Sequence, residues 1–223
     1  MHYYFITGTD TEIGKTFVTC TLLHAARAAG LRAVGYKPIA AGAELIDGTW
    51  SNEDARCLQQ ASSPGFSLAQ INPLCLREAV APHIAAASEG VVLDVPPLLA
   101  GFEQLAAQAD CVLVEGVGGF RVPLDDRLDT ADLATALRLP VILVVGMRLG
   151  CINHALLTAE AIEARGLALA GWVANTLAPR MNRLDENLEA LKARIRAPLL
   201  GVIPHSPAGP AAVAAEVRLP GAL

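Results

Sequence analysis

The clearest chemical signature lies near the N-terminus, where a glycine-bounded loop is followed by a lysine and a threonine. From residue 5 to residue 16 the sequence reads Phe-Ile-Thr-Gly-Thr-Asp-Thr-Glu-Ile-Gly-Lys-Thr. Gly8 and Gly14 allow backbone conformations and close approaches that a side chain would block. The loop amides and the start of the next helix can then bind a polyphosphate, with Lys15 reaching the β- and γ-phosphates and Thr16 ligating Mg²⁺. The segment predicts a phosphate-binding loop.

The spacing of this loop differs by one residue from the common pattern. Counted back from Gly14, Gly8 lies one position too early, and Thr9 stands where the first glycine is usual. The alternative interpretation is a plain strand-to-helix turn that happens to contain Gly-Lys-Thr. We favour nucleotide binding, because an apolar run at residues 3–6 precedes the loop and a helical pattern at residues 17–29 follows it.

Three further polar residues each end an apolar run, which is where ligands bind in open α/β sheets. Lys37 is either a charge-stabilising residue near the phosphates or a solvated lysine, and we favour the first role. Glu115, which precedes Gly-Val-Gly-Gly, is either a Mg²⁺ ligand or a solvated acid, and we favour the metal role. Asn175 is equally compatible with reading a base and with forming a turn.

The remaining candidates have structural explanations that are at least as good. Asp54 could hold the metal, but an acid in the first turn also simply suits a helix. The segment Gly-Cys-Ile-Asn at residues 150–153 begins a helix, and its exposed amides suit either a small anion or a plain cap. His83, His154 and His205 have no metal-ligand spacing, so we expect no zinc or catalytic role for them.

Apolar runs alternate with helical patterns along the whole chain. Strands are predicted at residues 3–6, 32–37, 111–114, 141–145, 169–174 and 199–203. Helices are predicted at residues 17–29, 53–61 (with Ser51 or Asn52 as N-cap), 83–89, 95–109, 130–137, 151–165 and 180–194. Residues 39–52, residues 72–82 and the tail beyond Ser206 are predicted to be irregular, the tail with one helical turn. This alternation is typical of a mostly parallel sheet covered on both faces, here a P-loop NTPase-like α/β fold in a single domain over residues 1–223.

Composition excludes several classes of function. The 223 residues suffice for one sizeable core, and a hydrophobic content of 53% with a mean hydropathy of +0.41 indicates a large buried sheet. No apolar stretch approaches the roughly 18 residues of a membrane span, and the N-terminus leaves no room for a signal peptide before the first strand. A net charge of −5 without a basic run argues against nucleic acid as a partner. Five scattered cysteines predict reduced thiols and a cytoplasmic protein.

Five segments together resemble the dethiobiotin synthetase family, which acts in the penultimate step of biotin synthesis. They are residues 7–16, 35–40, 114–119, 149–155 and 171–175, in the family's order, and the longer loop is the family's own form. The resemblance implies an ATP- and Mg²⁺-dependent cyclo-ligase. In the implied reaction, 7,8-diaminopelargonate takes up CO₂ as a carbamate, ATP converts the carbamate to a carbamic-phosphoric anhydride, and ring closure gives dethiobiotin with release of ADP and phosphate.

The resemblance also implies a set of residues for each ligand. The metal would be held by Thr16, Asp54 and Glu115. The charges around the γ-phosphate and the carbamate would be those of Lys15 and Lys37, with Thr11 nearby. The nucleotide would contact Glu12, Ile13, Gly14, Lys15, Thr16, Phe17, Asp54, Glu115, Gly116, Val117, Gly118, Asn175, Thr176, Pro204, His205 and Ser206. The diamine would contact Thr11, Lys37 and Ala41, and its carboxylate would bind Gly150, Cys151, Ile152 and Asn153 of the second subunit of a homodimer.

Two positions depart from the family pattern. Ala41 stands where members often have a serine that contacts the substrate, and Ala211 stands where some have a glutamate that contacts the nucleotide. The resemblance therefore leaves one substrate hydrogen bond and the preference for ATP over other nucleotides open.

Two other classes of protein share this predicted fold. The cobyrinate amidation enzymes carry an added glutamine-hydrolysing domain, for which 223 residues leave no room. Partition and positioning ATPases usually carry an extra lysine at the start of the loop, where this chain has Thr9 and Asp10, and often a basic amphipathic tail. The tail of this chain is neutral and interrupted by prolines, so we favour the ligase.

Overall fold

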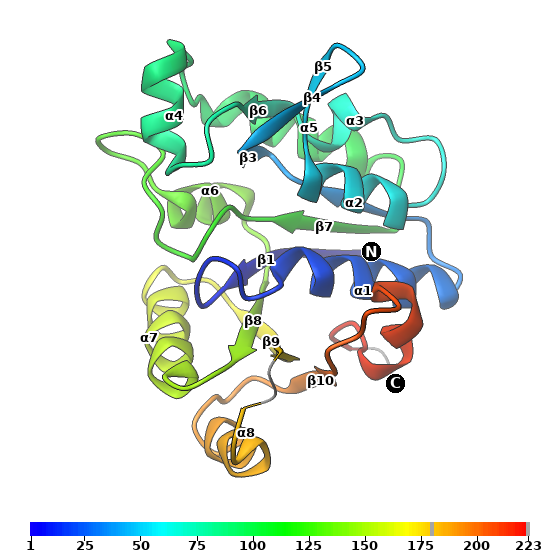
Figure 1. Ribbon diagram of the computed structural model, residues 1–223, viewed down its shortest axis with the longest axis vertical. Helices are drawn as coiled ribbons and strands as arrows, with labels where there is room; N and C mark the ends of the chain where they lie inside the picture. The colour runs from blue at the N-terminus through cyan, green and yellow to red at the C-terminus, as the bar shows by residue number, and fades with distance from the viewer. Residues whose placement is uncertain (179–180, 222–223) are drawn as a thin grey trace.

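A six-stranded parallel sheet forms the centre of the computed structural model, which describes residues 1–178 and 181–221 (Figure 1). The strand order is β10-β9-β8-β1-β7-β2, and every neighbouring pair is parallel. The strands are β1 (His2–Gly8), β2 (Ala33–Tyr36), β7 (Cys111–Glu115), β8 (Val141–Met147), β9 (Leu169–Thr176) and β10 (Leu199–Ile203). The predicted parallel sheet is confirmed, and all six predicted strands belong to it.

Helices cover both faces of the sheet. The described helices are α1 (Lys15–Ala28), α2 (Glu53–Ala61), α3 (Leu68–Ile71), α4 (Pro82–Glu89), α5 (Val95–Ala106), α6 (Thr130–Leu137), α7 (Cys151–Ala164) and α8 (Leu184–Lys192), of which α4 packs on β3 and β6. The crossover through α1 runs along the sheet in one direction, and those through α5 to α8 run in the other. Because such crossovers are right-handed, α1 lies on one face and α5 to α8 lie on the opposite face. The helix predicted for residues 180–194 corresponds to α8. Arg180 itself falls outside the described residues.

The prediction that residues 39–52 form an irregular loop is wrong. The segment contains β3 (Ile39–Ala41) and an antiparallel hairpin of β4 (Ala43–Ile46) and β5 (Thr49–Asn52). Asp47 and Gly48 form its two-residue turn, with φ angles of 49° and 77°. Asp-Gly between apolar residues is a strong hairpin signal, because both positions of a type I′ turn need positive φ. The signal was present in the sequence, but the interpretation gave more weight to the local Gly and Ala content.

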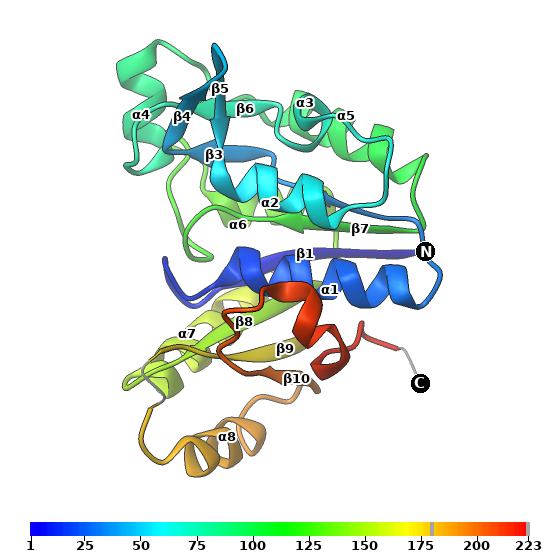
Figure 2. The same cartoon turned by 45° about the vertical axis from the view of Figure 1, so that its right-hand side comes forward.

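Two other stretches are also more regular than predicted. Residues 72–82 contain β6 (Leu74–Leu76), which pairs in parallel with β3, a contact that local pattern in a three-residue strand cannot reveal. The C-terminal tail contains a 3₁₀ segment, η1 (Pro210–Glu216), longer than the single turn predicted. Figure 2 shows η1 beside α1, and the apolar side chains of Val213, Val217 and Leu219 are buried in the main core.

The central strands are buried on both faces, which explains why their sequences are continuously apolar rather than alternating. The main core lies around β1, β2 and β7, and a second cluster joins β8 and β9 to α7 and α8. Within the described residues no helix combines the length and the hydropathy needed to cross a bilayer. All five cysteines are free thiols, as predicted.

Candidate active site

The predicted phosphate-binding loop connects β1 to α1 at the carboxyl end of the central sheet. Gly14, the N-cap of α1, has a φ of 77°, a left-handed conformation that favours glycine. A Cβ at Gly14 would lie 2.2 Å from Nδ2 of Asn175. The same Nδ2 donates a hydrogen bond of 2.8 Å to the carbonyl oxygen of Ile13. The amide of Asn175 therefore holds the end of the loop against the end of β9.

Lys15, the first residue of α1, is buried and points toward the loop that follows β7. Its Nζ donates a hydrogen bond of 2.7 Å to the carbonyl oxygen of Gly118. Burial, followed by the charge of Lys37, lowers the pKa of Lys15 to about 8. The ammonium group is poorly neutralised by the protein, so its position favours the approach of an anion.

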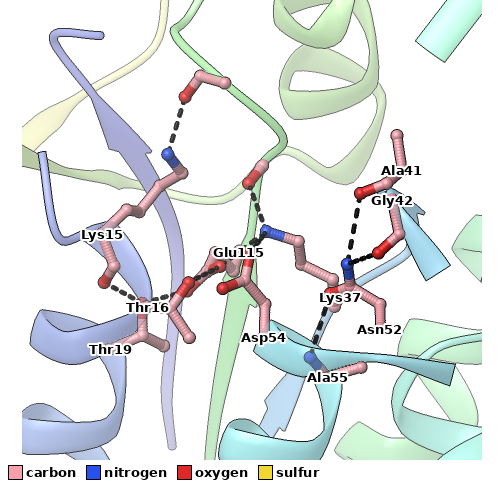
Figure 3. Close-up of polar contacts among 12 residues, drawn as sticks. Lys15, Thr16, Thr19, Lys37, Ala41, Gly42, Asn52, Asp54, Ala55 and Glu115 are labelled. Atoms are coloured by element: carbon pink, nitrogen blue, oxygen red, sulfur yellow. Dashed lines mark hydrogen bonds and ion pairs between the residues drawn. The ribbon is translucent and has the colours of Figure 1, made fainter. Parts of the chain in front are cut away.

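Glu115 lies at the centre of the polar contacts shown in Figure 3 and is fully buried at the end of β7. Its Oε1 accepts hydrogen bonds from Nζ of Lys37 at 2.7 Å and from Oγ1 of Thr16 at 2.8 Å. Its Oε2 lies 2.6 Å from Oγ1 of Thr19. Thr19 was not predicted as a site residue, although it lies three residues after Thr16 and so shares its helix face.

Lys37 connects both predicted acids. Its Nζ lies 3.1 Å from Oδ2 of Asp54 and 3.2 Å from the carbonyl oxygen of Gly116, in addition to the contact with Glu115. Burial alone would lower the pKa of Lys37, but the charges and hydrogen bonds of Glu115 and Asp54 outweigh it and raise the pKa. Burial would raise the pKa of Asp54, but the charge of Lys37 and a hydrogen bond from Thr16 keep it low. The lysine is therefore a buried cation.

Asn52 joins the hairpin to α2 and was predicted only as a possible cap. Its Oδ1 accepts a hydrogen bond of 3.3 Å from the amide of Ala55, which caps α2 and orients the first turn that carries Asp54. Its Nδ2 donates to the carbonyl oxygens of Ala41 at 3.2 Å and Gly42 at 3.0 Å (Figure 3). One side chain thus fixes both the end of β3 and the start of α2.

A cavity of about 650 Å³ collects ten of the predicted site residues. Those that line it are Thr11, Glu12, Gly14, Lys15, Thr16, Lys37, Ala41, Asp54, Val117 and Gly118. Lining residues that the sequence interpretation missed are Asn52, Ala79, Val80, Ala81, Pro82 and Val122. Residues 79–81 form a short apolar loop before α4, which begins at Pro82. Small apolar side chains carry no chemical signal that could have marked them.

A second hollow, of about 440 Å³, lies at the ends of β9 and β10. It is lined by Thr176, Leu177, Ala178, Leu184, Val202, Pro204 and His205. Three predicted nucleotide contacts, Thr176, Pro204 and His205, are therefore brought together around a largely apolar space. Asn175 lies one residue away and contacts the phosphate loop instead, and Ser206 follows directly in the chain.

The other predicted nucleotide contacts support the loop from beneath or beside it. Ile13 is buried against Gly146, where an added Cβ would lie 2.7 Å from the isoleucine side chain. Phe17 packs against the main core from the first turn of α1. Gly116 presents its carbonyl oxygen to Lys37.

Residues 150–153 lie apart from both hollows of the same chain. Gly150 is the N-cap of α7 with a φ of 95°, Cys151 is buried, Ile152 is half-buried and Asn153 is exposed. The preceding residue, Leu149, is 96% exposed. The start of α7 therefore does not complete the cavity within one chain.

Thr16, Asp54 and Glu115 offer one hydroxyl and two carboxylates, all of them oxygen donors. Such a set suits Mg²⁺, which prefers few protein oxygens together with water and phosphate oxygens. Within residues 1–178 and 181–221 no group of three or more His, Cys, Asp or Glu side chains is arranged to hold a metal by itself. The donor set fits a metal that a nucleotide brings with it.

Solved structures share the fold with this chain. The septum site-determining protein MinD from Pyrococcus horikoshii, complexed with Mg-ADP, gives a TM-score of 0.56 at 20% identity, covering 92% of this chain and 82% of that one. A ParA family ATPase from Chlorobium tepidum gives a TM-score of 0.58 at 9% identity, covering 92% and 85%. At such low identity the likeness concerns the P-loop ATPase fold alone.

Comparison with related sequences identifies the family within this fold. A family model described as AAA domain matches residues 2–210. The ATP-dependent dethiobiotin synthetase of Aromatoleum aromaticum is 68% identical over 219 residues, which cover 98% of this chain and 97% of that protein. The enzyme of the same name from Xylella fastidiosa strain 9a5c is 53% identical over 220 residues, with 98% and 97% covered. Together with the phosphate loop and its carboxylates, this identity over nearly the full length places the chain in the family of the ATP-dependent dethiobiotin synthetases, which are ATP-dependent ligases.

Proposed function

We propose that this chain condenses 7,8-diaminopelargonate, CO₂ and ATP to dethiobiotin, ADP and phosphate in biotin biosynthesis. One amine of the diamine takes up CO₂ and becomes a carbamate. A carbamate oxygen attacks the γ-phosphorus of ATP, which forms the carbamic-phosphoric anhydride and releases ADP. The second amine then attacks the carbamoyl carbon, closes the ureido ring and displaces phosphate. The observation that carries the proposal is the cavity lined by the two buried lysines and Asp54, with the fully buried Glu115 hydrogen-bonded to Lys37.

The reaction needs positioning and charge neutralisation more than a nucleophilic side chain. Lys15 has a lowered pKa and no acid partner at hydrogen-bond distance among the described residues, and it would bind the β- and γ-phosphates. Lys37, from the opposite wall, would neutralise the carbamate and the transferred phosphoryl group. Thr11, exposed at the tip of the phosphate loop, would contact the carbamate.

Mg²⁺ would be held by Thr16, Asp54 and Glu115, and it would neutralise charge on the phosphate oxygens when bound. Oγ1 of Thr16 donates a hydrogen bond of 2.8 Å to Oε1 of Glu115, so these two oxygen ligands already lie side by side. Adenine would lie in the apolar hollow lined by Thr176, Pro204 and His205.

We also propose a homodimer in which the start of α7 completes the partner's cavity and binds the carboxylate of the diamine. The position of residues 150–153 outside both hollows of their own chain supports this arrangement, as does the exposed Leu149 beside them. The chain would act as one domain over residues 1–223 in the cytoplasm. Its acidic charge supports small molecules, rather than nucleic acid or membrane, as its ligands.

A coupled ADP-release assay tests the proposal, with ATP and MgCl₂ present throughout. Release should require the diamine and bicarbonate together, and mass spectrometry should find dethiobiotin in equimolar amount. A Lys15→Met protein serves as the control for contaminating ATPases. ADP release at an equal rate without the diamine would refute the ligase, and stimulation by DNA or lipid vesicles instead would point to a positioning ATPase.

A further inference from the structure

The loop between β7 and α6 contacts both site lysines. We refer to residues 116–122 as the carbonyl loop, because its carbonyl oxygens bind the two ammonium groups. The carbonyl of Gly116 accepts from Lys37 at 3.2 Å, and that of Gly118 accepts from Lys15 at 2.7 Å. Val117, Gly118 and Val122 also line the cavity. A shift of this loop would move a cavity wall and one hydrogen-bond acceptor of each cation.

Thr130, the first residue of α6, fastens the far end of the carbonyl loop. It is 1% exposed. Its Oγ1 donates a hydrogen bond of 2.6 Å to the carbonyl of Phe120 and accepts one of 3.1 Å from the amide of Val122. The amide of Thr130 donates a third bond, of 2.9 Å, to the carbonyl of Val122. The hydroxyl thus both donates to the loop and accepts from it.

The N-terminus of α6, which carries Thr130, is held by a capping box and by ion pairs. Asp129 and Asp132 form a capping box at the start of α6. Arg165, the C-cap of α7, pairs with both acids, and Arg121 from the carbonyl loop pairs with Asp129. Because Asp129 already caps the helix, the hydroxyl of Thr130 is not needed for α6 to begin. The hydrogen bonds of this hydroxyl hold the carbonyl loop instead.

We propose that Thr130 is a positioning residue of the ligase, which sets the places of Lys15 and Lys37 through the carbonyl loop. It does not line the cavity, so its effect must pass through backbone atoms. Small displacements of charged groups are costly in a site that works by positioning, where an error of about 1 Å can reduce the rate on the order of 100-fold.

The test compares Thr130→Val, which keeps the shape and removes the hydroxyl, with Thr130→Ser, which keeps the hydroxyl. The matched control is Thr135→Val on the same helix, because Oγ1 of Thr135 bonds only within α6, to the carbonyl of Ala131 at 2.7 Å. For each protein we would measure kcat and KM in the ADP-release assay, the Kd for ADP in MgCl₂ by calorimetry, and the Tm.

Thr130→Val should reduce kcat/KM for the diamine by about tenfold or more and weaken ADP binding by about threefold to tenfold, the scale of one lost hydrogen bond. Thr130→Ser should stay within about threefold of wild type, and Thr135→Val should match wild type. If Thr130→Val lowers only the Tm and leaves kcat, KM and Kd unchanged, the residue is merely structural and the proposal is wrong.

The turnover measurement rests on the proposed function, whereas ADP binding does not. If wild-type protein fails to consume the diamine, the calorimetric comparison still decides the role of Thr130. If Thr130→Val does not fold, Thr130→Cys replaces it and is compared with Thr130→Ser, since the two side chains differ only in a thiol, a weak donor, in place of the hydroxyl. Normal ADP affinity and turnover in that variant would overturn the proposal.

Discussion

Nζ of Lys37 lies 2.7 Å from Oε1 of Glu115, and side-chain exposures of 3% and 0% place this ion pair inside the protein. The sequence suggested a lysine at a strand end, where little contribution to the core is expected. In the structure the lysine compensates a buried carboxylate. Its removal would therefore affect stability as well as activity.

Lys37→Met should lower the free energy of unfolding by about 3–5 kcal/mol, because it leaves Glu115 buried without its cation. Turnover should fall by at least about 100-fold, since one preorganised charge is lost. The double variant Lys37→Met, Glu115→Gln removes both charges and should recover much of the stability while remaining inactive. Urea unfolding and ADP release measure the two effects. Wild-type stability of Lys37→Met would contradict the buried pair.

Thr19→Val should lower both the stability of the protein and its affinity for MgADP, because it removes a donor to Oε2 of Glu115. A hydrogen bond to a charged group contributes about 1.5–3 kcal/mol, so unfolding should become easier by that amount. The control is Thr21→Val, which is equally buried on α1 but loses only a bond to the carbonyl of Phe17, worth about 1 kcal/mol. MgADP binding, measured by calorimetry, should weaken for Thr19→Val and not for Thr21→Val. If the two variants have the same stability and the same affinity for MgADP, Thr19 has no role in the site.

Mixing two inactive proteins tests the proposed dimer. Lys15→Met disables the nucleotide side, and Ile152→Pro removes an amide in the first turn of α7, where proline is tolerated. A heterodimer places both defects in one composite site and leaves the other intact. Equal mixtures that exchange subunits should therefore recover roughly a quarter of wild-type activity. If native mass spectrometry detects heterodimers and no activity returns, each site lies within one chain.

The Asp132 carboxylate should make stability depend on pH. Burial would raise its pKa, but the amide of Asp129 and the guanidinium of Arg165 outweigh burial and lower it. A lowered pKa means that the stabilisation is present above the unfolded value, near pH ~4, and is lost as the pH falls through the folded value. Asp132→Asn should thus be less stable than wild type at pH 7, with a gap that narrows below pH ~4. Urea titrations at several pH values measure the gap.

Asp126→Asn changes an exposed acid in the loop before α6 and is the control in that series for the loss of one carboxylate. A gap between Asp132→Asn and wild type that stayed constant down to pH ~3 would mean that the ion pair with Arg165 contributes nothing.

Local patterns were sufficient to predict the parallel sheet and the phosphate loop. A parallel strand buried on both faces is continuously apolar, and the helix after a Gly-Lys-Thr loop directs its first amides toward a bound phosphate. A few consecutive residues are therefore enough to predict each feature. Lys37 and Glu115 could both be predicted at the carboxyl edge of the sheet, where ligands bind. That their strands, β2 and β7, are neighbours is known only from the structure. The Asp47-Gly48 hairpin was also locally encoded and was misread.

Only the tertiary structure decided which groups touch. The bond from Asn175 to the carbonyl of Ile13 joins residues 162 positions apart, and that from Thr19 to Glu115 joins residues 96 positions apart. The pairing of β3 with β6 and the hold of Thr130 on the carbonyl loop depend on how the sheet and α6 are packed. Such contacts depend on the distances between helices and strands that are far apart in the sequence. The local periodicity of a sequence does not contain those distances, because a helical threonine has the same sequence pattern whether its hydroxyl contacts a carboxylate or its own helix.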